Sequence, residues 1–175
     1  MESIYSAPKD TIRTNSGLYI NVFDTNPETI NIEDIAHALS MIPRFGGHLN
    51  RFYSVCQHSI MCCNLAMDYG FEYAIAGLLH DGSEAYLLDM PTPIKNKLPD
   101  YKSTEHRLME IIAIKYGFEF PLNPIIKKVD AQSLEIEWDN LVENDNIKFV
   151  CMTSSDAKKE FLKLFHMIIN NKDGN

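Results

Sequence analysis

The chain has 175 residues, with 45% hydrophobic and 23% charged side chains, and its formal net charge is −8 at pH 7. This composition is ordinary for a water-soluble globular protein and allows one domain with a well-packed core. The acidic balance argues against broad nucleic-acid binding through a basic face, while a local cationic pocket is still compatible with it. Since there is neither a membrane-length apolar run nor a signal-peptide pattern, we expect a cytoplasmic protein with no nucleic-acid or membrane partner.

The cysteines give no sign of a metal knuckle or a redox motif. They are Cys56, Cys62, Cys63 and Cys151, and no two of them form a C-x-x-C pair. The sequence therefore supports neither a zinc knuckle nor a thioredoxin-like site. We expect all four to be reduced and buried, which is typical of cytosolic proteins.

The N-terminal part is expected to contain a loose arm, a small β element and one helix. Residues 1–10 form the arm. Apolar residues between Thr14 and Asp24 alternate with a period of two, which predicts a short strand or hairpin. Asn31 can cap a helix whose apolar residues recur every three or four positions. This helix stops at Pro43, because proline cannot continue it.

The middle of the chain predicts four helices after a glycine-containing loop at residues 44–48. They are expected over about 54–70, 72–88, 93–98 and 103–116. Ser54 can cap the first of them, and Gly70 suits its end. Pro93 suits the first turn of the short third helix.

The C-terminal part predicts two further helices and one extended piece. A long helix is expected over residues 123–141, a short extended segment over 147–152, and a last helix from 155 to about 170. Asn123 and Pro124 are a good cap and first-turn pair, and Ser155 can cap the last helix. Leu134 and Trp138 fall on the apolar positions of the long helix. The sum is an all-α single domain over residues 1–175 with a small N-terminal β-hairpin.

The stretch from Ala76 to Pro93 concentrates titratable groups in apolar surroundings. His80 and Asp81 are adjacent after an apolar run, Glu84 follows one helical turn later, and Asp89 comes just before two prolines. A structural helix would keep such carboxylates on its solvent-facing side. We therefore expect this stretch to carry chemistry.

Four residues have the types and the order of a metal site, namely His58, His80, Asp81 and Asp130. Two imidazoles and two carboxylates can bind one divalent first-row metal and leave positions open for water and substrate. Adjacent residues on a helix point about 100° apart, so His80 and Asp81 would converge only on a metal lying over the helix between them. Neighbouring helices would then supply His58 and Asp130, since a bundle core is a usual place for such a site.

Each of these residues also has a structural interpretation. His80 and Asp81 could be a hydrogen-bonded pair without a metal, and His58 alone could be a satisfied core histidine. Asp130 depends on spacing and context. Glu84 could be a solvated helix residue and Asp89 a hydrogen-bond acceptor in a turn, while Arg44 and Lys95 could be surface charges. For His48, which the glycine loop places near the proposed site, both interpretations are open.

Beyond the individual residues, the sequence resembles the HD-domain phosphohydrolase superfamily. The resemblance is carried by the ordered set H…H-D…D and by the segments RFG at 44–46, YSVCQHS at 53–59, LLHDGSEAY at 78–86 and DMPTPIK at 89–95. These segments look like the branch that contains bacterial 5'-deoxynucleotidases and phage dATP triphosphohydrolases. The resemblance covers roughly residues 32–141. It implies a helical bundle with an arm and hairpin at 1–30, an HD core at 31–142 and a C-terminal helix and tail at 143–175.

The resemblance implies a role for each matching residue. The metal ligands would be His58, His80, Asp81 and Asp130. Glu84 and Asp89 would handle the proton and orient the attacking water. Arg44 and Lys95 would hold phosphate oxygens, for which guanidinium and ammonium groups are suited. Phe45 would pack against the sugar or base, at a position where relatives carry Trp.

The implied function is metal-dependent hydrolysis of a (deoxy)nucleotide at the 5'-phosphate. We expect a dATP-type triphosphohydrolase that releases deoxynucleoside and triphosphate; the alternatives are a 5'-deoxynucleotidase acting on dNMPs and a non-catalytic nucleotide-binding module. The cofactor would be Co, Mn, Zn, Fe or Ni, with Mg accompanying the triphosphate. Gly47 stands where the dATP-specific relative has a bulky aliphatic residue that crowds a purine 2-amino group. Relatives form dimers or larger rings, so a homo-oligomer, a dimer or hexamer, is expected.

Overall fold

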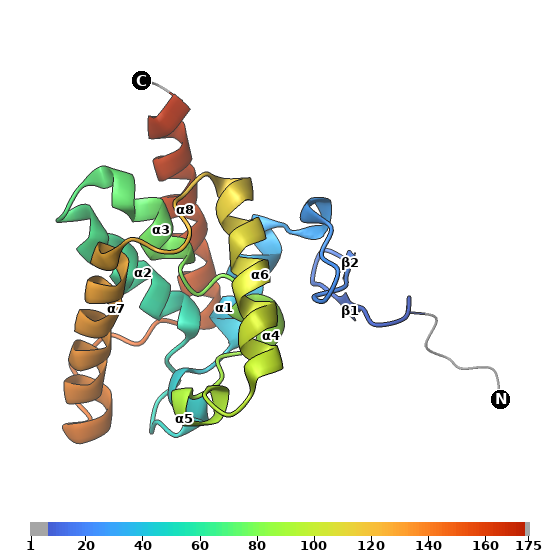
Figure 1. Ribbon diagram of the computed structural model, residues 1–175. Helices are drawn as coiled ribbons and strands as arrows, with labels where there is room; N and C mark the ends of the chain where they lie inside the picture. Colours follow the sequence, from blue (N-terminus) through green and yellow to red (C-terminus); the bar gives the residue numbers. More distant parts are fainter. Residues whose placement is uncertain (1–6, 174–175) are drawn as a thin grey trace.

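A computed structural model describes residues 7–173, which form a mostly helical structure with a small antiparallel sheet near the N-terminus (Figure 1). This confirms the predicted fold class. The sheet pairs β1 (Ile12–Arg13) with β2 (Tyr19–Ile20). The α-helices are α1 (Ile32–Met41), α2 (Val55–Met67), α3 (Ala74–Leu79), α4 (Glu84–Leu87), α5 (Thr92–Lys95), α6 (Pro99–Tyr116), α7 (Pro124–Glu137) and α8 (Ser154–Asp173). Short 3-10 segments lie at η1 (Pro27–Thr29), η2 (Arg44–Gly47) and η3 (Phe71–Tyr73), and a π-helical turn, η4 (Trp138–Glu143), directly continues α7.

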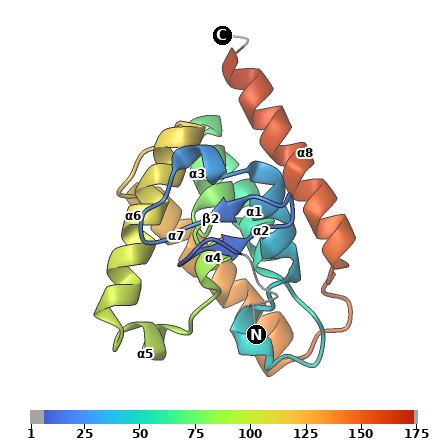
Figure 2. The ribbon, with the colours of Figure 1, turned by 90° about the vertical axis from the view of Figure 1, so that its right-hand side faces the viewer.

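Helix α2 lies at the centre of the structure. It packs against α1, α3, α7 and α8, and Figure 2 places α6 and α8 on opposite sides of the molecule with the shorter helices between them. Leu39, Leu79 and Phe161 are fully buried in the core around α2, and each such side chain contributes roughly 1.5–3 kcal/mol by leaving water. Because α2 is covered on several sides, polar groups on it must find partners within the protein.

Several helix starts lie where the capping residues predict them. The side chain of Asn31 accepts a hydrogen bond from the Glu33 amide at 2.9 Å, and Ser54 and Asn123 cap α2 and α7 in the same way. The last helix is an exception, because the Thr153 hydroxyl accepts from the Asp156 amide at 3.1 Å. The prediction of Ser155 as that cap was therefore wrong by two residues.

The helix predicted from about residue 72 to 88 is interrupted. Helix α3 ends at Leu79, a turn runs through His80, and α4 begins at Glu84. Gly82 fits inside this turn because a Cβ there would lie 3.0 Å from the Leu79 carbonyl oxygen. His80 and Asp81 consequently lie in a turn, and the geometric constraint expected for two neighbours within a helix does not apply to them.

Other boundaries also differ from the predictions. Helix α6 begins at Pro99 instead of about 103, and α5 ends at Lys95 instead of 98. Residues 147–152 form turns and irregular chain where a short extended segment was predicted. Helix α8 continues past residue 170 to Asp173. Leu134 and Trp138 are 43% and 48% exposed, so they are not core positions of the long helix.

The hairpin is tied to the helical body through α1. The backbone amide and hydroxyl of Ser16 both donate to the Asp34 carboxylate, at 2.7 and 2.6 Å, and Ile20 of β2 is fully buried. Of the predicted arm, residues 1–6 lie outside the described part of the chain. Within residues 7–173, no helix combines the length and apolar composition needed to cross a membrane.

Candidate metal centre

Three different parts of the chain bring the predicted ligand residues together. His58 lies on α2, His80 and Asp81 lie in the turn after α3, and Asp130 lies on α7. The side chain of His58 is fully buried, that of His80 is 4% exposed, and those of Asp81 and Asp130 are 21% and 47% exposed. The two imidazoles therefore form the floor of the cluster, and the two carboxylates reach it from its more open side.

The ligand atoms are separated by distances that suit one metal ion. The Nε2 atoms of His58 and His80 are 3.2 Å apart, and Asp130 Oδ1 lies 3.1 and 3.7 Å from them. Asp81 Oδ2 lies 3.2 Å from His80 Nε2 and 3.6 Å from His58 Nε2. Bonds of about 2.1 Å to one ion require neighbouring ligand atoms about 3.0 to 3.4 Å apart. The separations around the cluster scatter about this range, so the donor set fits a divalent metal.

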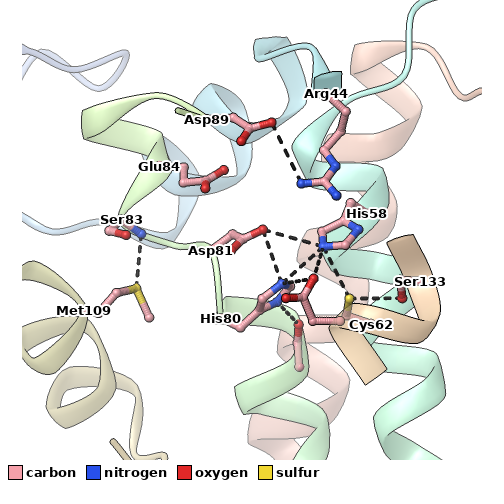
Figure 3. A network of polar contacts seen from close by, with 12 residues as sticks. Arg44, His58, Cys62, His80, Asp81, Ser83, Glu84, Asp89, Met109 and Ser133 are labelled. Atoms are coloured by element: carbon pink, nitrogen blue, oxygen red, sulfur yellow. Dashed lines mark hydrogen bonds and ion pairs between the residues drawn. The ribbon is translucent and has the colours of Figure 1, made fainter. Parts of the chain in front are cut away.

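A fifth donor, Cys62, was missed by the sequence reasoning. Its Sγ is buried 3.5 Å from His58 Nε2, and the ligand atoms of His58, Cys62, His80 and Asp130 all lie within 4.8 Å of one another. Figure 3 shows Cys62 and Asp81 on opposite sides of the His58 ring nitrogen. The available signal was its position four residues after His58, which places both on one face of α2.

A second missed residue, Glu137, orients the cluster from behind. It is fully buried on α7, where its Oε1 accepts hydrogen bonds from His58 Nδ1 at 2.6 Å and Tyr53 Oη at 3.1 Å. Because the Nδ1 proton is donated to this carboxylate, Nε2 is the ring nitrogen that faces the cluster, and it would offer a lone pair once a metal displaces its proton. Glu137 follows Asp130 by seven residues and so lies on nearly the same helix face. That spacing could have identified it.

The imidazoles and carboxylates of the cluster stabilise each other's charged forms. Burial lowers the pKa of His58, but hydrogen bonds to Asp130, Cys62 and Glu137 hold it well above its ordinary value. The pKa of Asp81 is correspondingly low, because burial is outweighed by the neighbouring His80 imidazole. An environment that stabilises protons on two facing imidazoles equally favours a cation between them, and metal binding would displace those protons.

Asp81 and Asp130 of the cluster line a cavity of about 640 Å³ that is also lined by Arg44, Phe45, Glu84, Asp89 and Lys95. The cavity therefore brings together all but one of the predicted contact and catalytic residues that are not ligands. Its volume is within the range of about 300–1,000 Å³ that is usual for small-molecule sites.

Arg44 is held above the cluster by carboxylates. Its Nη2 donates to Glu137 Oε2 at 3.0 Å, and Nη1 lies 3.8 Å from Asp89. These carboxylates outweigh burial and raise the pKa of Arg44, so it stays charged. The loop that carries it turns through Phe45, Gly46 and Gly47, whose φ angles are 55°, 60° and 78°. A bulky residue such as Phe45 rarely adopts a positive φ, and such strain is often found at functional sites.

Glu84 and Lys95 lie next to each other in the lining of the same cavity. Lys95 Nζ donates to Glu105 at 2.7 Å and lies 3.8 Å from Glu84 Oε1. Burial, followed by the nearby charges of Asp81 and Asp89, raises the pKa of Glu84 well above its usual value. Its Oε2 is buried without a hydrogen-bond partner, so this carboxyl group can hold a proton and has a free oxygen.

Gly47 is the predicted contact that the cavity does not include. It lines a separate hollow of about 240 Å³, and a Cβ placed on it would contact only Pro43 at 3.8 Å. Its neighbours Gly46 and His48 do line the main cavity. His48 is therefore a residue of the cavity lining.

Fold and site together define a mostly helical protein with a candidate buried metal centre. No family model matches the chain. It is 40% identical to the uncharacterized protein YfdR of Escherichia coli (strain K12) over 134 residues, which are 77% of this chain and 74% of YfdR. It is also 31% identical over 140 residues to the uncharacterized protein RCAP_rcc00048 of Rhodobacter capsulatus, covering 74% of this chain and 71% of that protein. The chain belongs to the family of YfdR.

Proposed function

We propose that this protein is a metal-dependent phosphohydrolase that cleaves (deoxy)nucleotides at the 5'-phosphate. One observation carries the proposal: a cluster of two imidazoles and two carboxylates opens onto a cavity that also holds Arg44 and Lys95. A metal site and two cations in one cavity suit an anionic ester that is cleaved by water. The resemblance to HD-domain phosphohydrolases supports the same reaction, with a dATP-type triphosphohydrolase as the favoured member.

The ligands of the metal would be His58, His80, Asp81 and Asp130. When bound, a divalent ion supplies Lewis acidity and lowers the pKa of a coordinated water. Histidine and carboxylate donors suit Co, Mn, Zn, Fe or Ni. Mg would enter only with a triphosphate, since it usually binds through carboxylates and substrate phosphates.

The cations of the cavity bind and orient the phosphate. Arg44 is suited to this because Glu137 fixes one edge of its guanidinium, while Nε is buried without a protein partner. A planar guanidinium can bind two phosphate oxygens at once, and Lys95 adds a point charge. Their joint effect is to neutralise charge that develops on the phosphate oxygens.

Glu84 and Asp89 manage the proton. Burial raises the pKa of both carboxyl groups, and the negative charge of Asp81 raises both pKa values further. A carboxyl group with a raised pKa can carry a proton to the departing 5'-oxygen near neutral pH. Figure 3 shows both groups on the side of the cluster where Asp81 lies.

The deciding experiment is hydrolysis of all dNMPs, dNTPs and NTPs by metal-stripped protein, with Co, Mn, Zn or Mg added back. Metal-dependent release of deoxynucleoside and triphosphate, strongest with dATP, is the expected result. Release from dNMPs alone would assign a 5'-deoxynucleotidase. Retained metal with no turnover of any nucleotide would contradict the proposal and favour a non-catalytic binding module.

Base preference is a separate outcome of the same assay. Gly47 lies outside the main cavity, so it offers no steric filter against the 2-amino group of guanine. A preference for dATP over dGTP therefore requires that other residues exclude the 2-amino group. Equal rates with dATP and dGTP would remove dATP specificity while leaving the reaction itself intact.

A further inference from the structure

One wall of the cavity is formed by α7 and η4 and is mostly apolar beyond Asp130. Asp130, Leu134, Trp138 and Val142 all line it and follow one another at four-residue spacing along α7 and η4. Four residues exceed one α-helical turn, so such a row normally drifts around the helix. The wider π-helical turn from Trp138 onward compensates for this drift, and π-helical turns frequently occur at functional sites. A continuous wall therefore leads from a metal-ligand candidate to an aromatic ring.

Trp138 is held in a fixed orientation on this wall. Its Nε1 donates to Glu143 Oε1 at 3.0 Å, and its ring centroid lies 6.1 Å from that of Phe45, with the rings inclined at 59°. The side chain is nevertheless 48% exposed. A large aromatic side chain that is anchored at its polar edge and open toward a cavity is preorganised for a flat ligand.

The cavity lining combines two kinds of group. Arg44, Lys95 and the carboxylates of the metal cluster lie beside an aromatic pair, with the Arg44 guanidinium 5.5 Å from the centre of the Phe45 ring. The cations and a bound metal suit an anionic group, and Phe45 and Trp138 suit a flat, apolar group of the same ligand. Trp138 lies eight residues beyond Asp130, about 12 Å along the helix axis. A spacer of sugar size is needed between the anion and the ring.

We propose that Trp138 stacks on the nucleobase of the substrate, with Phe45 contacting the edge of the same base or its sugar. This inference depends on the proposed nucleotide specificity and adds the subsite that recognises the base. Stacking on an aromatic side chain tolerates every base, because all bases have a π-face. Trp138 therefore distinguishes nucleotides from other phosphate esters and does not distinguish one base from another.

The chain contains a single tryptophan, so its intrinsic fluorescence reports on this position alone. We would mix metal-loaded protein with dATP, dAMP, deoxyribose 5-phosphate or inorganic triphosphate and record emission before turnover. Excitation at the red edge of the indole absorption avoids the bases. Saturable quenching by dATP or dAMP, and none by the two probes without a base, is expected. Equal quenching by deoxyribose 5-phosphate, or no quenching by a nucleotide that calorimetry shows to be bound, would overturn the inference.

Substitution gives a second, independent readout. Trp138→Leu should raise KM for nucleotides roughly 5- to 150-fold, which corresponds to one stacked base, and should leave kcat and metal content unchanged. Trp138→Phe should recover most of the affinity. Phe23→Leu is the control, because Phe23 is an exposed aromatic residue that does not line the cavity. A Trp138→Leu protein with unchanged KM refutes the stacking role while the hydrolase proposal stands. If the wild type hydrolyses no nucleotide, the hydrolase proposal fails, and the fluorescence experiment still decides whether a base binds here.

Discussion

The two sides of the histidine pair differ in a way that separates their tasks. On the open side, Asp81 and Asp130 have side chains that are 21% and 47% exposed, and they border the large cavity. On the closed side, Cys62, Ser133 and Glu137 are fully buried and bond to one another or to His58. Of these residues, only the two on the open side line the cavity. Apart from the Cys62 thiol, which is itself close enough to be a donor, the closed side acts on the cluster through the position and charge of the imidazoles.

This difference suggests a division that experiments can test. Changes to cavity residues on the open side that are not ligands, such as Glu84, should lower turnover while metal is retained. Changes on the closed side should lower metal affinity first. Outer partners of metal-binding histidines commonly affect affinity without touching the metal. The residue between the two sides, His80, should affect both properties.

The largest effect is expected from His80→Ala. It removes a donor atom that lies 3.2 Å from His58 Nε2 and 3.2 Å from Asp81 Oδ2, so both bound metal and turnover should be lost. Metal content by mass spectrometry and hydrolysis under the same conditions measure the two losses. Circular dichroism should show an unchanged helical fold, because the substitution lies in a turn.

Two further variants test whether this result is specific to the site. Asp81→Asn keeps the shape of the side chain, so it should reduce turnover severely even if His80→Ala were to fold poorly. His166→Ala changes an exposed histidine on α8 and should behave as the wild type. Full activity in either His80→Ala or Asp81→Asn would refute the site.

A smaller effect, confined to the open side, is expected from Glu84→Gln. The buried carboxyl group of Glu84 has a raised pKa and an unpartnered oxygen, which suits proton transfer. Its loss should lower kcat roughly 10²- to 10⁴-fold without lowering metal content. Glu110→Gln, at an exposed position of α6, is the control. Loss of metal in Glu84→Gln would show that the two sides are not separable.

The closed side is tested by Glu137→Gln. An amide has one acceptor oxygen, so it cannot accept from His58, Tyr53 and Arg44 together. Metal affinity should fall roughly 10- to 100-fold, which competition with a chelator can measure. Unfolding should also become easier by about 3–5 kcal/mol in the metal-free protein, because buried charges lose a partner.

Glu135→Gln provides the comparison on the same helix, since Glu135 is exposed. It should change neither affinity nor stability. If Glu137→Gln kept full metal affinity and lost only turnover, the role of Glu137 would be to position Arg44 and not His58. The proposed division between the two sides would then be wrong.

What the sequence predicted well was decided by local chemistry. Asn31, Ser54 and Asn123 cap helices because an acceptor side chain next to free backbone amides needs no distant partner. The types and order of His58, His80, Asp81 and Asp130 likewise limit the chemistry they can perform, and the fold brings all four together.

What the sequence missed depends on contacts between distant segments. The break after Leu79 is invisible in a helical apolar pattern, because it is set by how the turn packs. Trp138 looked like a core residue of a long helix, but the surface it faces is a cavity and not another helix. Glu137 reaches His58 only because α7 packs against α2. Cys62 shares a face of α2 with His58, but only the packing of other segments brings His80 and Asp130 beside it.

The smallest effect is expected from Cys62→Ser. Its Sγ lies 3.5 Å from His58 Nε2, close to the roughly 3.1 to 3.6 Å expected for sulfur and nitrogen on one ion. Burial raises the pKa of the Cys62 thiol, but His80 and His58 outweigh it and lower the pKa to about 6. A thiolate ligand favours Zn over Mn. The substitution should therefore reduce that preference by no more than about tenfold, or roughly 1.4 kcal/mol, because four other donors remain.

Cobalt-loaded protein tests this contact without any substrate. A thiolate bound to cobalt gives a charge-transfer band in the near ultraviolet, which should be present in the wild type and absent in Cys62→Ser. Cys63→Ser is the matched control, because Cys63 is equally buried and packs in the core instead of the cluster. If the wild-type protein lacked the band, the Cys62 thiol would lie near the metal without binding it. The closed side would then hold the imidazoles in position and supply no metal ligand.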